Sequence, residues 1–154
     1  MFVIEDVKSG QKAIDYFGGF HDGYVKSIKL ITDARYDVDE EDLGGDKESV
    51  LQSAGLWCHE ELSLEMEIGH FNYNWPNVPY DQIISLKFTD VKGVCGDFLT
   101  DRVVGQQMLN VIINCSESDE LTFEVQLSEF HTNNSNNPKY RLFTFKRLEI
   151  KEKA

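Results

Sequence analysis

Glu61-Leu-Ser-Leu-Glu-Met-Glu-Ile-Gly-His-Phe71 is the most regular stretch of the chain. Its polar and apolar side chains alternate as far as Ile68, which is the period of a β-strand with one buried and one solvated face. A strand wetted on one side is typical of an antiparallel sheet, because the strands of parallel sheets are usually covered on both faces. The stretch therefore predicts a β-fold with antiparallel pairing.

Strands are also predicted on both sides of this stretch, where apolar residues alternate or form short runs between turn signals. The expected strands are Tyr24–Ile31, Gln82–Thr89, Met108–Cys115, Leu121–Leu127 and Tyr140–Ile150, with either a short strand or a disordered start at Phe2–Ile4. Val91–Val94 is expected to extend Gln82–Thr89 past a bend, and residues 151–154 are expected to be a frayed end.

The side-chain pattern also predicts the faces of these strands. In Tyr24–Ile31, Val25 and Ile31 lie opposite Ile28 and Leu30, so this strand is expected to be covered on both sides. One face of the strand that starts at Met108 is expected to carry Leu109, Val111, Ile113 and Cys115. The short Ser116–Glu120 link predicts a hairpin between this strand and the next.

One short helix is predicted over Gly10–Phe17. The Ser9 hydroxyl can accept a hydrogen bond from a free N–H of the first turn, and Gly18 is expected to end the helix. Lys12 stands where Glu or Gln would complete a capping box with Ser9. Six to eight strands with one short N-terminal helix predict a mainly β single domain (minor α+β) over residues 1–154. Its expected form is an antiparallel sandwich or a curved, partly closed sheet.

The composition excludes several classes of partner. The net charge is −12 over 154 residues, and the 15 Lys and Arg residues form no block. Binding of phosphates needs a basic surface, so nucleic acid and anionic membranes are not expected partners. No apolar run reaches the length of about 18 residues that a membrane span requires, and no signal peptide is expected. The three cysteines are widely spaced, which predicts reduced thiols in the cytoplasm.

An acidic tract and an aromatic loop are the candidate binding surfaces. The tract runs from Asp37 to Glu48, and its composition favours a solvated loop and a recognition surface for a basic protein. It lacks the Gly of a calcium loop, because position six is Asp42. Aromatic residues in the Pro-containing loop either cover an open end of the sheet or anchor an interface. The predicted contact residues are Asp37, Asp39, Glu40, Glu41, Asp42, Tyr73, Trp75 and Tyr80.

His21-Asp22 is the one pair that invites a ligand site, since a histidine beside a carboxylate recurs in metal and acid–base sites. The alternative is that Asp22 braces the turn and His21 packs beside Phe20, with Gly23 free to adopt a positive φ. The four histidines lack metal-finger spacing, and no phosphate-binding loop, dinucleotide fingerprint or nucleophile elbow occurs. No metal, cofactor or catalytic set is therefore predicted.

The pattern Phe17-x-x-Phe20-His21-Asp22-Gly23, leading into Tyr24–Ile31, resembles the opening of immunity proteins of bacterial polymorphic toxin systems, of the immunity protein 50 type. Ile84–Phe88 and Tyr140–Ile150 correspond to a later strand and a final amphipathic strand. The acidic insert after Asp33 departs from this pattern. The resemblance implies a non-enzymatic protein that binds and inhibits a cognate toxin. The alternative is a small-molecule-binding protein or hydrolase with its site at His21 and Asp22.

Overall fold

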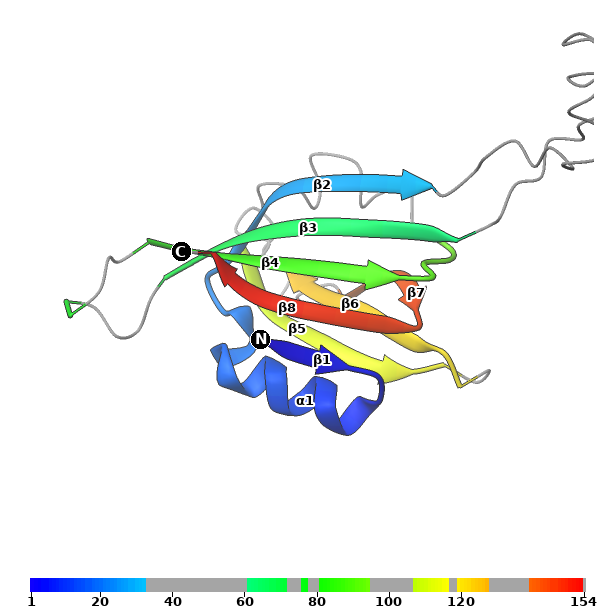
Figure 1. The fold of residues 1–154 in the computed structure, drawn as a ribbon. Coiled ribbons are helices and arrows are strands. Elements are labelled where there is room, and N and C mark those ends of the chain that lie inside the picture. The colour runs from blue at the N-terminus through cyan, green and yellow to red at the C-terminus, as the bar shows by residue number, and fades with distance from the viewer. Residues whose placement is uncertain are drawn as a thin grey trace, which may run out of the picture.

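Figure 1 shows the chain as a computed structural model, which describes residues 1–32, 61–71, 76–77, 81–94, 107–116, 119–127 and 139–153. These residues form eight strands, one α-helix and one short 3-10 helix. The elements are β1 (Phe2–Ile4), α1 (Val7–Tyr16), η1 (Gly18–Phe20), β2 (Tyr24–Thr32), β3 (Leu62–Phe71), β4 (Asp81–Thr89), β5 (Met108–Cys115), β6 (Leu121–Leu127), β7 (Lys139–Phe145) and β8 (Arg147–Lys153). No helix in these ranges is long and apolar enough to cross a membrane.

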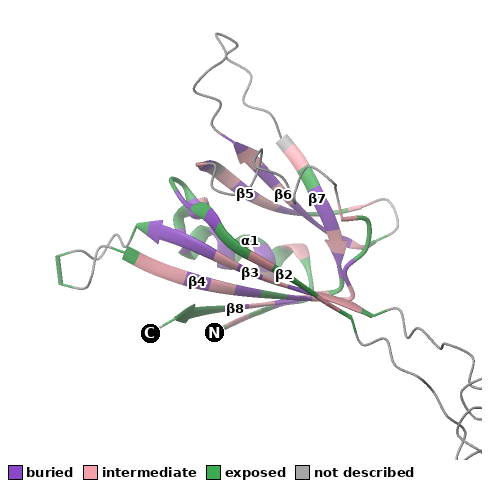
Figure 2. Ribbon diagram, turned by 90° about the horizontal axis from the view of Figure 1, so that it is seen from above, coloured by how far each residue is buried: buried purple, intermediate pink, exposed green. Residues whose placement is uncertain are grey.

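The strands make two antiparallel sheets that are not closed. The first has the order β1-β8-β4-β3-β2, and the second has the order β5-β6-β7. The two sheets form the two layers that Figure 2 shows from above. Helix α1 packs against β1 and β5, which are edge strands of different sheets. The predicted mainly β, antiparallel fold is therefore confirmed, with the sandwich as its form.

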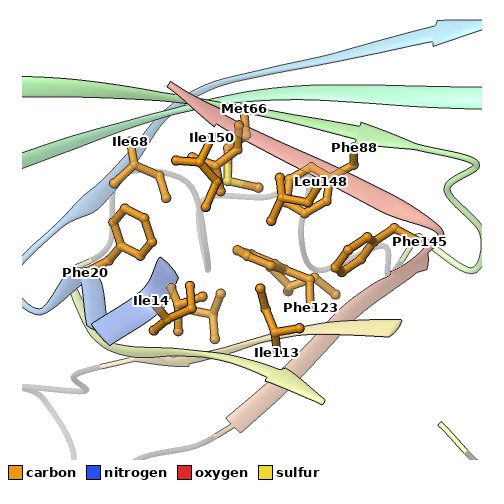
Figure 3. Packing of buried hydrophobic residues seen from close by; sticks show 14 of the residues in the cluster. Ile14, Phe20, Met66, Ile68, Phe88, Ile113, Phe123, Phe145, Leu148 and Ile150 are labelled. Carbon is orange, nitrogen blue, oxygen red and sulfur yellow. The ribbon is translucent and has the colours of Figure 1, made fainter. Parts of the chain in front are cut away.

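The core lies between the two sheets. Leu64, Met66 and Ile68 of β3 are fully buried, so the alternation that predicted this strand is confirmed. Phe88 of β4 meets Phe123 of β6 with ring centroids 5.0 Å apart, which joins the sheets across the interior. Figure 3 shows these rings pointing inward, together with apolar side chains from both sheets and from α1. Burial of this continuous apolar surface is the main force that holds the sandwich together.

The last predicted strand is in fact two strands. The chain bends at Lys146, so β7 belongs to the three-stranded sheet and β8 to the five-stranded sheet. The bend lets Phe145 and Leu148, three residues apart, both face the core, which an uninterrupted strand of period two does not allow. The prediction of a frayed end after Ile150 was also wrong, because residues 151–153 pair with residues 83–85 of β4.

Two β-bulges change the predicted faces. The pairing of β2 with β3 shifts between Val25 and Ser27, so Val25 faces the core with Ile28 instead of lying opposite it. The predicted two-sided cover of this strand was therefore wrong. A second shift, between Met108 and Asn110 of β5, interrupts the predicted alternation and puts the buried Met108 in line with the buried Val111. Alternation alone cannot reveal such an extra residue.

The start of the chain is ordered, and α1 begins earlier than predicted. β1 pairs with β8, so the alternative of a disordered start is wrong. The N-cap of α1 is Asp6, whose Oδ1 accepts a hydrogen bond from the Ser9 N–H at 2.6 Å. The Ser9 hydroxyl accepts from the Asp6 N–H in return, which completes a capping box with Ser in place of Glu. Ser9 is thus inside the helix instead of being its cap.

The turn between β5 and β6 was predicted correctly, whereas the course of the chain after β4 was not. The predicted hairpin of β5 and β6 is confirmed, and the Ser116 N–H donates to the Glu120 carbonyl at 2.7 Å within its turn. Residues 91–94 were predicted to extend β4 past a bend, but they do not continue its pairing within the five-stranded sheet. After the bend at Asp90, Lys92 instead forms a single bridge with Thr144 of β7, in the other sheet. This bridge links the two sheets at one end of the sandwich.

Candidate functional site

The structure describes only part of the predicted site. His21 and Asp22 are described and lie in the connection between η1 and β2. The predicted partner-binding residues lie outside the described residues and stay predictions: Asp37, Asp39, Glu40, Glu41, Asp42, Tyr73, Trp75 and Tyr80. The described surface offers further candidates.

Residues 18–23, the corner, have an unusual backbone. Gly18 and Gly19 have φ angles of 62° and 71°, and the non-glycine residues Phe20 and Asp22 have φ angles of 55° and 63°. The left-handed region costs a non-glycine residue about 1–2 kcal/mol, most of all a bulky one. Gly23, which is free to adopt such a φ, does not do so. It is needed for close approach, because a Cβ there would lie 2.9 Å from the Phe20 carbonyl oxygen.

Hydrogen bonds to the start of β5 hold the corner in place. The Asp22 N–H donates to the Met108 carbonyl at 2.9 Å, and the Met108 N–H donates to the Gly23 carbonyl at 2.8 Å. The Gln107 side-chain amide donates to Asp22 Oδ1 at 2.5 Å. We call these three bonds the seam, because they tie the beginning of β2 in one sheet to β5 in the other.

His21 and Asp22 form a loose, half-exposed pair. His21 Nε2 lies 3.6 Å from Asp22 Oδ1, and each side chain exposes 51% of its surface. An ion pair at such exposure contributes little stability. Within the described ranges, no group of three or more His, Cys, Asp or Glu side chains is arranged to hold a metal ion. His59 and His131 lie outside those ranges.

His70 lies beneath the corner at the end of β3. Only 4% of its surface is exposed, and its ring meets the Phe20 ring edge-on with centroids 5.9 Å apart. Burial lowers the pKa of His70, while the Gln82 side chain, the Asp22 carboxylate and the His21 backbone act to raise it. The folded protein therefore favours the neutral imidazole.

Aromatic side chains gather beside β1 in what we call the aromatic hollow, defined by Met1, Phe2, Tyr16 and Phe17. The Phe2 ring lies 4.9 Å from the Tyr16 ring and 5.6 Å from the Phe17 ring, between centroids. These residues, with the end of β8, line a depression of about 450 Å³. Met1 exposes 78% of its surface and Tyr16 exposes 65%.

Sequence reasoning missed the aromatic hollow. Tyr16 alone gave a signal, because Ala13, Ile14 and Phe17 form the apolar face of the helix and leave Tyr16 outside it. Nothing in the sequence shows that Phe2 comes to lie beside Tyr16. That proximity arises because β1 and α1 are joined by a tight turn and pack against each other.

The outer face of the five-stranded sheet carries charged side chains instead of aromatic ones, and we call it the charged face. Lys29, Glu65, Lys87 and Glu149 lie side by side on four neighbouring strands, so their charges alternate along one row. Lys153 forms an ion pair with Glu67, and this contact lowers the pKa of the Glu67 carboxyl. Opposite charges paired across strands stabilise a sheet and stay solvated. The positive and negative side chains of the charged face thus compensate one another.

An acidic depression of about 360 Å³ lies at the end of the sandwich near Lys146. Its carboxylates come from the turns that follow β1 and β4 and precede β6, namely Glu5, Asp90, Asp119 and Glu120. Lys92 lies 3.5 Å from Glu120 and offsets part of this charge. The described surface therefore shares the acidic character that the sequence concentrates in residues 37–48.

No protein-family model matches the chain, and no curated protein or solved structure shows significant similarity to it. Information on function comes instead from the arrangement of the residues and from the resemblance of residues 17–23 to immunity proteins. Met1 and Tyr16 of the aromatic hollow are the most exposed large apolar side chains among the described residues.

Proposed function

We propose that this chain is a non-enzymatic protein-binding domain that holds its partner at the aromatic hollow. The observation that carries the proposal is the exposure of Tyr16 and Met1 beside the Phe2 ring. Aromatic residues and Met are enriched at the centres of protein interfaces, where they contribute most of the binding energy. Lys and Glu are depleted there, so the charged face is the weaker candidate.

The partner is a basic protein that presents an apolar or aromatic side chain to the hollow. The net charge of −12 and the acidic tract of residues 37–48 favour such a partner, because opposite charges attract before contact is made. The acidic depression near Lys146 adds negative charge on the described surface. The carboxylates accelerate association with the partner, and the aromatic side chains slow dissociation.

The resemblance of residues 17–23 makes the proposal more specific. We propose a cytoplasmic bacterial immunity protein, whose basic partner is a toxin that it inhibits by binding. Such an inhibitor acts by covering a surface of the toxin and needs no catalytic groups of its own. An acidic inhibitor suits a toxin with a basic, phosphate-binding cleft, because its carboxylates take the place of the phosphates.

A second candidate function is a ligand site at His21 and Asp22. It is favoured by the left-handed backbone of Phe20 and Asp22, because strain of this kind is often retained at functional sites. A His21→Ala variant that binds no ligand but melts at the wild-type temperature would support it. A variant that only melts earlier would leave His21 with a structural role.

The proposed function is tested by affinity capture from the source cells with the tagged full chain. Tyr16→Ala removes the most exposed ring of the hollow, and Leu30→Ala is the matched control, because Leu30 is also exposed (41%) but lies on β2, at the far edge of the sheet. We expect the wild type and Leu30→Ala to retain one basic protein that Tyr16→Ala loses. High salt should reduce the amount retained. Equal capture of the same protein by both variants would contradict the proposal.

A further inference from the structure

His70 is buried at a point where the fold is held under strain. Its ring packs edge-on against Phe20, and Phe20 in turn stacks on Phe17 with centroids 5.1 Å apart and planes 16° apart. Phe20 and Asp22 both have positive φ angles. Because this conformation is costly, it persists only while the surrounding contacts, including the packing on His70, hold it.

Among the described residues, the charged groups that act on His70 are Asp22 and His21 of the corner. Asp22 attracts a protonated imidazole and His21 repels it. Strand β4 faces it with the uncharged Gln82, and β5 supplies the uncharged Gln107 and Met108 to the seam. Asp22 Oδ1 already accepts the hydrogen bond from Gln107, so a charged imidazole that moved toward Asp22 would approach a carboxylate that is part of the seam.

We infer that His70 is a proton-controlled latch on the seam: uptake of a proton from water by its imidazole in mild acid opens the corner and releases the start of β2 from β5. The neutral ring fits under Phe20. The charged ring must be hydrated or move toward Asp22, and either change disturbs Phe20 and the Asp22–Gln107 bond. This inference is independent of what the protein binds.

The direction of the pH effect follows from burial. The closed corner lowers the pKa of His70 below its ordinary value of about 6.5, so an open corner takes up the proton more readily. The contribution of the neutral ring to the closed form is complete above about pH 6.5 and is lost as the pH falls toward the lowered pKa. Between these two values, the ratio of closed to open corner falls by up to about tenfold per pH unit.

Amide hydrogen exchange of the full chain at about pH 7.5 and about pH 5.5 tests the latch, after correction for intrinsic exchange rates. The reporter amides are Asp22 and Met108, which donate across the seam. The control amides are Lys92 and Thr144, which also bridge the two sheets but lie at the other end of the sandwich. We expect acid to reduce protection at the seam and to leave the control bridge unchanged. Equal protection of the seam at both pH values would overturn the latch.

Variants separate His70 from its neighbours. His70→Gln should make seam protection independent of pH, and a pH dependence that survives this change would overturn the proposal. If His70→Gln does not fold, two milder variants give the answer. Asp22→Asn keeps an acceptor for Gln107 and tolerates a positive φ. It removes the carboxylate that raises the pKa of His70 in the closed corner, so it should enlarge the loss of seam protection in acid. His21→Gln removes a group that lowers this pKa and should reduce the loss. Losses that stay the same or change in the reverse directions would contradict the latch.

Discussion

Two aromatic clusters of this protein have similar geometry and very different exposure. In the buried cluster between the sheets, Phe88 and Phe143 have ring centroids 4.7 Å apart, and both side chains are almost completely buried. In the aromatic hollow, Phe2 and Tyr16 are 4.9 Å apart, yet Tyr16 exposes 65% of its surface. The first cluster is explained by folding, because it removes apolar surface from water. The second leaves apolar surface in water, so folding alone does not account for it.

The largest expected effect is the contrast in stability between the two clusters. Phe88→Ala should lower the free energy of unfolding by about 3–5 kcal/mol, because it opens a cavity among three other rings. Tyr16→Ala should cost less than about 1.5 kcal/mol, the upper value for an aromatic pair. Urea denaturation of both variants measures the difference. Similar losses of stability for the two variants would mean that Tyr16 belongs to the core and that the two aromatic clusters do not differ in their role.

Backbone strain beside the aromatic hollow gives a smaller effect. Gly19→Ala should cost the 1–2 kcal/mol or so of a left-handed alanine, plus the cost of turning away the Asn110 side chain, whose Oδ1 would lie 2.5 Å from the new Cβ. Gly93→Ala is the matched control, since Gly93 has a φ of 62° with no atom within 4 Å of the added Cβ. Thermal unfolding measures both. A loss for Gly19→Ala no larger than for Gly93→Ala would show that the Asn110 side chain turns away at no cost and does not hold the corner in place.

The smallest expected effect is a loss of stability on the charged face. The same variant tests whether exposure alone marks a binding surface. Lys87→Glu places a carboxylate between Glu65 and Glu149, and each like-charged pair should cost about 0.2–1 kcal/mol. Added salt should reduce the loss, since these charges are solvated. Lys87→Gln, the control, should lose less. If Lys87→Glu instead abolished partner capture without loss of stability, the charged face would replace the aromatic hollow as the binding surface.

Much of the fold could be predicted from local patterns. The alternation of Leu64, Met66 and Ile68 defined β3, and similar patterns located β4 and β6 to within a residue, because one buried face imposes a period of two. Departures from that period could not be predicted. The bulge at Val25 and the bend at Lys146 depend on how the two sheets meet, and that is decided by contacts between residues far apart in the chain.

The candidate site was less accessible to sequence reasoning. His21 and Asp22 attracted attention as a pair, but the seam depends on Gln107, which is 85 residues away from Asp22. The proximity of Phe2 to Tyr16 and of His70 to Phe20 is likewise tertiary. Local sequence therefore indicated the corner, and only the packing revealed what it contacts.

The most direct test of the central claim is the dissociation constant of the captured basic partner for the wild type and for Tyr16→Ala, at one salt concentration. If the aromatic hollow is the binding centre, loss of a hot-spot ring worth about 2 kcal/mol should raise Kd by about 30-fold. Leu30→Ala should leave Kd unchanged, and all three proteins should melt at similar temperatures. An unchanged Kd for Tyr16→Ala would contradict the account and would move the binding surface to another part of the molecule.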